Sequence, residues 1–207
     1  MRSRKTAGSI FILALLISAV ASASALANPE FLGSIPTAIT GTSGATALES
    51  ESGLAVECPK DKVTGTVNSA STLETRVDLE SCKVAGFTAQ SLGDKSGVVL
   101  VPLTGKLCYR NSFAHEVGVV LTLPSGGVHI EVPSLGELLV ITGSILGALT
   151  PVNVSSSSGT LEVFATLFCE GVSSGLSIET AHNGSPLGAK ARTTESLTYT
   201  HALTLDA

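Results

Sequence analysis

Residues 105–116, with the sequence GKLCYRNSFAHE, hold the densest group of reactive side chains in the protein. A cysteine nucleophile needs a nearby base and a lowered thiol pKa, and His115 follows Cys108 closely in the sequence. Arg110 and Glu116 add a positive and a negative charge to the same stretch. The stretch is therefore a candidate active site, unless its cysteine is held in a disulfide.

His129 and Glu131 form a second candidate group, separated only by Ile130. Side chains two positions apart in a strand lie on the same face, so this pair could share a metal ion with a third ligand from a neighbouring strand. A cupin-like metal site would need further histidines nearby, and Pro133 follows instead. We therefore favour a solvent-facing pair, with the apolar residues of the same strand facing the core.

Several common catalytic motifs are absent from the sequence, which contains no P-loop, no dinucleotide fingerprint and no H-E-x-x-H pair. The four aspartates are scattered and form no calcium-binding loop. Glutamate pairs of the glycosidase type would lack aromatic platforms, since the chain has no Trp and two Tyr. We predict a non-enzymatic protein with no catalytic residue, no cofactor and no metal ligand.

The first 27 residues have the order of a secretory signal peptide. Basic residues, among them Arg2 and Arg4, precede the apolar run 10–20, and small residues end at Ala27. This run is about half the roughly 20 residues of a membrane-spanning helix. We therefore predict a signal peptide over 1–27, no transmembrane anchor after its removal, and a single secreted, extracellular β domain over 28–207.

Export would place the four cysteines in an oxidising compartment, where an even number predicts two disulfides rather than a free catalytic thiol. Three pairings are possible. We favour Cys58 with Cys82 and Cys108 with Cys169, because each cysteine then lies at the end of an expected strand.

The disulfide interpretation changes the meaning of the stretch 105–116. Tyr109 then continues a strand, Arg110 begins a turn, and His115 opens the next strand. On a loop braced at Cys108, Arg110 and His115 become candidate binding residues, together with His129 and Glu131.

The net charge of the exported chain limits which kinds of molecule can be its partner. Removal of the signal takes three of the twelve basic residues and none of the seventeen acidic ones, so the exported chain has a net charge of 9 − 17 = −8. Such a surface repels nucleic acid and anionic lipid. A partner is then expected among other extracellular or cell-surface components.

Hydrophobic patterning predicts strands throughout the exported chain. Residues 73–80 and 197–205 alternate between apolar and polar side chains, which is typical of half-buried strands. Four runs are continuously apolar and β-branched, as in strands covered on both faces: 98–103, 117–123, 138–145 and 161–168.

Clusters of Gly, Pro and Ser between these runs indicate turns and loops, among them 124–127 and 155–159. No helical spacing is sustained over three turns in the exported chain. We predict an all-β fold, a single-domain antiparallel β-sandwich or closed β-barrel of about 10–12 short strands.

Several short segments together are similar to a large group of uncharacterised, secreted, β-rich proteins of soil actinobacteria. They are, in order, 28–32 (NPEFL), 43–44 before 48–49, 107–109 (LCY), 128–133 (VHIEVP), 143–147 (GSILG) and 150–153 (TPVN). Members of the group often have Gly before the cysteine equivalent to Cys82, where this chain has Ser81. The resemblance implies export and an all-β fold, and it brings no activity, ligand or catalytic residue.

Three functional hypotheses follow. The first is a secreted, non-enzymatic β domain that binds another extracellular or cell-surface component. The second is a carrier of a small apolar ligand, with strands closed around a cavity. The third is a metal-dependent secreted enzyme centred on His129 and Glu131.

The cysteine interpretation predicts that the denatured, unreduced protein contains no thiol that can be alkylated. After reduction, mass spectrometry should detect alkylation at all four cysteines, Cys58, Cys82, Cys108 and Cys169. Alkylation of all four without reduction would contradict the predicted disulfides.

Overall fold

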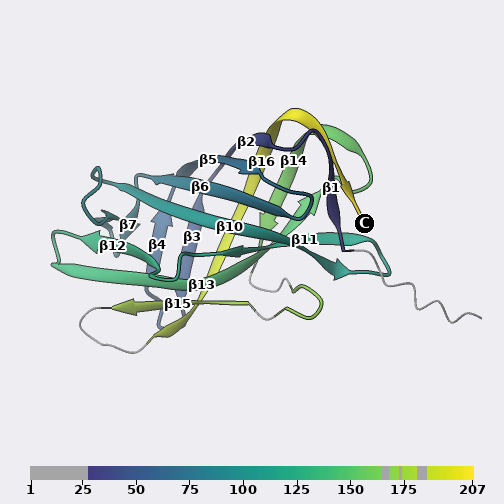
Figure 1. Cartoon of the computed structure of the whole chain (residues 1–207). Helices are drawn as coiled ribbons and strands as arrows, with labels where there is room; N and C mark the ends of the chain where they lie inside the picture. Colours follow the sequence, from purple (N-terminus) through teal and green to yellow (C-terminus); the bar gives the residue numbers. More distant parts are fainter. Residues whose placement is uncertain (1–27, 165–167, 173, 181–185) are drawn as a thin grey trace, which may run out of the picture.

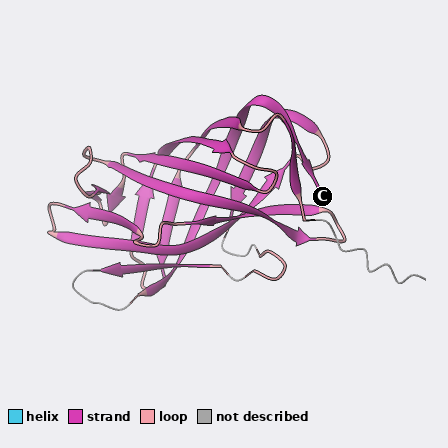
Figure 2. Ribbon diagram, viewed as in Figure 1, coloured by secondary structure: helices cyan, strands magenta, loops and turns pink. Residues whose placement is uncertain are grey.

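The structure, a computed structural model, describes residues 28–164, 168–172, 174–180 and 186–207; the predicted signal peptide lies outside them. All regular structure in the described residues is β-strand, which confirms the all-β prediction (Figure 1, Figure 2). No helix there is long and apolar enough to cross a membrane. The strands are β1 (Glu30–Gly33), β2 (Thr37–Ser43), β3 (Thr46–Ser50), β4 (Ala55–Cys58), β5 (Lys60–Val67), β6 (Thr72–Glu80), β7 (Lys83–Val84), β8 (Phe87–Thr88), β9 (Gln90–Ser91), β10 (Val98–Asn111), β11 (Glu116–Thr122), β12 (Val128–Val132), β13 (Glu137–Thr150), β14 (Ser155–Val163), β15 (Gly175–Thr180) and β16 (Leu187–Asp206).

The sheet closes on itself because β16 pairs along both of its edges, with β2 on one side and with β14 on the other. The hydrogen-bonded circuit runs through β2, β5, β6, β10, β11, β13, β14 and β16, and returns to β2. Every pair in the circuit is antiparallel. Figure 1 shows β5, β6 and β10 across the front and β16 crossing behind them, so the sheet forms a barrel-like ring.

Alternation along the strands separates the inside of the ring from the outside. In β6, Leu73 and Val77 face the interior, whereas Glu74 and Arg76 face outward. In β10, Val99 is fully buried and lines the interior in the same way. Burial of these apolar side chains is the main source of stability, at roughly 25 cal/mol per Å² of apolar surface.

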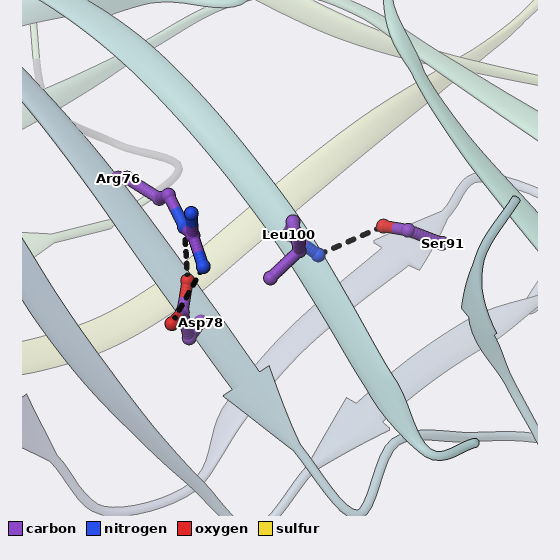
Figure 3. A network of polar contacts seen from close by, with 4 residues as sticks. All are labelled: Arg76, Asp78, Ser91 and Leu100. Carbon is purple, nitrogen blue, oxygen red and sulfur yellow. Dashed lines mark hydrogen bonds and ion pairs between the residues drawn. The ribbon is translucent and has the colours of Figure 1, made fainter. Parts of the chain in front are cut away.

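One edge of strand β10 is paired over only part of its length. Residues 104–111 pair with β11, whereas 98–103 pair with β6 alone among the described strands. The free edge is partly satisfied by β9, because the Leu100 amide donates a hydrogen bond to Ser91 Oγ at 2.8 Å (Figure 3). The same view shows the ion pair of Arg76 and Asp78 on β6.

Two disulfides join the cysteines as predicted. Cys58 and Cys82, with Cα atoms 4.2 Å apart, belong to the core cluster inside the ring. Cys108 and Cys169, with Cα atoms 5.8 Å apart, lie in a separate small cluster with Leu146. Two disulfides are typical of proteins in an oxidising compartment.

The strands are more numerous and longer than the predicted ten to twelve short ones. The described residues form sixteen strands, and β10, β13 and β16 have 14, 14 and 20 residues. Residues 155–159, expected to be a loop, begin β14 and pair with β16 from Ser155 onward. Backbone pairing with β16 along one edge stabilises this polar segment, and composition alone does not predict such pairing. The strand expected over 161–168 ends at Val163, and 165–167 lie outside the described residues.

Gly143 lies in the region where β13 changes partners. On one edge β13 pairs with β12 before Gly143 and with β11 after it; on the other edge it pairs with β15 as far as Ser144 and with β14 from Gly147. The φ of Gly143 is +107°, and a Cβ built there would lie 2.0 Å from the Gly175 carbonyl oxygen.

Gly143→Ala should therefore lower the free energy of unfolding by about 2–4 kcal/mol, measured by urea denaturation. Gly126→Ala is the matched control, since no atom lies within 4 Å of a Cβ at Gly126. Equal unfolding midpoints for the two variants would contradict this account of β13.

Candidate functional site

Arg110 and His115 lie at the hairpin between β10 and β11, but not as expected from the sequence. Arg110 is still within β10, and His115 lies in the turn before β11 with a φ of 54°. The Arg110 guanidinium is 3.8 Å from Glu116, and its Nε is buried without a hydrogen-bond partner among the described residues. His115 Nδ1 lies 2.7 Å from the carbonyl oxygen of Ala207. This hairpin is held to Ala207, and Cys108 beside it is bonded to Cys169, so the hairpin has no free thiol for His115 to activate.

His129 and Glu131 occupy the outer face of β12, with Ile130 buried on the inner face, as predicted. His129 Nε2 lies 3.1 Å from the Gly126 carbonyl oxygen, and Gln90 Nε2 donates to Glu131 Oε1 at 2.6 Å. The described residues contain no group of three or more His, Cys, Asp or Glu side chains that could hold a metal ion. In the sheet order β13 lies between β11 and β12, so the two candidate pairs do not form one site.

An open hollow of about 880 Å³ lies on the outer surface beside β10, and residues 104–109 line part of it. Its wall is mixed, with apolar side chains beside the oppositely charged Lys106 and Glu74, and it includes Tyr109 and Glu170. The Glu170 amide donates to the Tyr109 carbonyl oxygen at 2.7 Å, which holds the disulfide-linked segment against the strand.

The interior of the ring contains a cavity of about 130 Å³ whose wall is almost entirely apolar. Val99, Val119 and Ile130 are among the fully buried residues that line it. Polar side chains enter this wall mainly at one place, where β3, β5 and β16 contribute Thr46, Asp61, Thr193 and Glu195. The candidate functional site consists of the cavity and these four residues, which we call the polar end.

Asp61 is 5% exposed and is held by three hydrogen bonds. The Ser43 amide donates to Oδ1 at 2.8 Å, the Ser43 hydroxyl donates to Oδ2, and the Thr46 hydroxyl donates to Oδ2 at 2.9 Å. Several donors to one carboxylate favour its charged form. The surroundings of Asp61 are therefore those of a hydrogen-bonded carboxylate.

Glu195 is 3% exposed and lies at the end of a chain of hydroxyl groups. Thr46 Oγ1 is 3.0 Å from Thr193 Oγ1, which is 3.3 Å from Glu195 Oε1. A hydroxyl has one proton to donate, and the Thr46 proton is already directed to Asp61. Two hydroxyls thus cannot supply a proton to all three contacts of the chain from Asp61 to Glu195. A proton on Glu195 Oε1 completes it.

The electrostatic environment also favours a protonated Glu195. Burial raises the pKa of Glu195 from 4.5 to about 8, and the negative charge of Asp61 adds to the shift. Burial also raises the pKa of Tyr199, the other titratable residue in the cavity wall, so Tyr199 is neutral. The remaining charged or titratable residues of the strands around the polar end are all exposed: Glu49, Lys60, Lys62, Glu162, Lys190, Arg192, His201 and Asp206.

The polar end can hold a proton and a hydrogen bond, but both carboxyl groups are enclosed by the ring. An apolar cavity with a few convergent polar groups is the usual form of a small-molecule binding site. The geometry is therefore that of a compartment for a small ligand.

Sequence reasoning missed Asp61 and Glu195. A usable signal was present: Glu195 shares its face of β16 with Leu197 and Tyr199, and Asp61 shares its face of β5 with Val63. A carboxylate at an inward position of an alternating strand indicates a partner inside. The topology that brings these two carboxylates together could not be read from either segment alone.

No family model, curated protein or solved structure matches this chain. The site must therefore be interpreted from its own geometry.

The raised pKa of Glu195 predicts a specific pH dependence of stability. Between about pH 5 and pH 8 the folded protein keeps a proton that the unfolded chain has lost. The free energy of unfolding should then fall by roughly 1 kcal/mol for each pH unit in this range.

Glu195→Gln should remove this slope in urea denaturation measured across the same range, because the amide cannot ionise. Glu162→Gln, an exposed change on the neighbouring β14, should leave the slope unchanged. The same slope in Glu195→Gln and in the unchanged protein would contradict a proton on Glu195.

Proposed function

We propose that the protein is a secreted, non-enzymatic carrier that holds a small apolar ligand inside its ring of strands. The observation that carries this proposal is the apolar cavity of about 130 Å³ inside the ring. The sequence pattern of a signal peptide and the two disulfides support a role outside the cell.

The size of the cavity supports the proposal. An apolar cavity of about 150 Å³ stays free of water and binds benzene or xenon, so a compartment of this size accepts a compact organic molecule. Eight-stranded barrels have an interior that side chains either fill or leave open to one small ligand. In this ring, residues such as Val63, Val77 and Val119 leave part of the interior unfilled.

A second function is favoured by the open hollow beside β10. Its volume of about 880 Å³ lies within the usual range of ligand pockets, and it is braced by the disulfide of Cys108 and Cys169. An extracellular partner bound there would contact Tyr109 and Lys106 rather than the interior.

The carrier proposal predicts saturable binding of n-pentane inside the ring. NMR titration of the secreted protein should shift the methyl signals of Val99, Val119 and Ile130, which line the cavity. Val99→Phe should weaken binding at least about tenfold by filling the cavity, whereas Val154→Phe at an exposed position should not.

The titration of the unchanged protein is decisive even if Val99→Phe does not fold. Interior methyl signals that do not move would contradict the carrier. Shifts confined to residues of the outer hollow would favour the second function.

A further inference from the structure

We propose that the ligand of the interior cavity is a small apolar amine, whose ammonium group binds at the polar end between Asp61 and Glu195. This inference rests on the proposed carrier function and names the chemical class of the ligand. It is carried by two independent observations at the polar end, a buried negative charge without a cation and a buried oxygen without a partner.

The first observation is the missing counter-charge. The Asp61 carboxylate accepts three hydrogen bonds and is 5% exposed, and Glu195 beside it is 3% exposed. Buried charges in proteins are paired, because an isolated ion loses its hydration without compensation. The described residues that line the cavity include no Lys, Arg or His, and the three ion pairs among the described residues lie elsewhere. The cation that would complete the site must then come from a bound molecule.

The second observation is the free oxygen of Glu195. Oε1 is occupied by the hydroxyl of Thr193, whereas Oε2 is buried and has no hydrogen-bond partner among the described residues. A buried acceptor without a partner costs free energy that a donor restores. An ammonium group has three N–H donors and no acceptor, so it can satisfy Oε2 while it lies close to the Asp61 charge.

The rest of the wall defines the body of the ligand. Beyond the polar end the cavity is lined mainly by Val, Leu and Ile side chains, with Thr75 and Tyr199 as further polar residues and no further charged group among the described residues. A ligand that fits has a compact hydrocarbon body of about the size of benzene and one amine at its end. A carboxylate at the same place would face the like charge of Asp61.

The test compares n-butylamine, 1-butanol, n-pentane and n-butyrate. The first three have the same number of non-hydrogen atoms, and n-butyrate reverses the charge. Dissociation constants are measured by NMR titration of the secreted protein at about pH 6.5. We expect n-butylamine to bind roughly tenfold or more tightly than 1-butanol, and n-butyrate not to bind in the cavity.

Two variants separate the charge from the proton. Asp61→Asn should abolish the preference for the amine, because the negative charge is lost. Glu195→Gln should preserve it within about threefold, because the amide keeps an oxygen at the position of Oε2 and leaves Asp61 charged. Asp78→Asn, which removes an outward carboxylate paired with Arg76, is the matched control and should behave like the unchanged protein (Figure 3).

Each outcome is interpretable. If n-pentane and 1-butanol bind and n-butylamine binds no better than 1-butanol, the carrier stands and the amine is wrong. If n-butyrate binds in the cavity as well as n-butylamine, the amine is also wrong. If none of the probes binds, both proposals fail. The series on the unchanged protein decides between these results even if Asp61→Asn does not fold.

Discussion

The pairing of β14 with β16 is the constraint on which the rest of the structure depends. It closes the circuit of strands, so each strand of the ring has a neighbour on both sides and every inward side chain faces the same enclosed space. Alternation then puts the valines and leucines of β6, β10 and β11 into one interior. Closure also turns a polar, serine-rich segment at 155–159 into part of the wall, because its backbone is held by β16.

Burial of a carboxyl group in an apolar interior costs free energy unless the group is hydrogen-bonded or neutral. The two carboxyl groups of the polar end meet this requirement in different ways. The Asp61 carboxylate accepts hydrogen bonds from Ser43 and Thr46, and Glu195 keeps a proton through burial and the negative charge beside it. The two acids differ because Asp61 receives three donors, whereas Glu195 receives the Thr193 hydroxyl and lies against the Asp61 carboxylate. In the carrier and amine proposals, the ammonium group of a bound ligand would compensate the negative charge that remains at the polar end.

Much of the fold could be predicted from local patterns, whereas the site could not. The alternation at 73–80 predicts β6 closely, and the position of the cysteines at the ends of expected strands led to the pairing that the structure shows. The solvent-facing arrangement of His129 and Glu131 also follows from alternation alone. Asp61 and Glu195 were missed because the contact between their carboxyl groups depends on strand order. In the sheet, β2 lies between β5 and β16 and brings the two strands near each other. For the stretch 105–116, the even number of cysteines already favoured a disulfide over an active site, and the bond between Cys108 and Cys169 confirms it.

The most direct test of the account is a crystal structure of the secreted protein grown with n-butylamine at about pH 6.5. The account predicts one molecule inside the ring, with its nitrogen within hydrogen-bond distance of Glu195 Oε2 and its carbon chain against Val99 and Val119. An interior without the amine at saturating concentration, or an amine bound only in the outer hollow beside Tyr109, would contradict it.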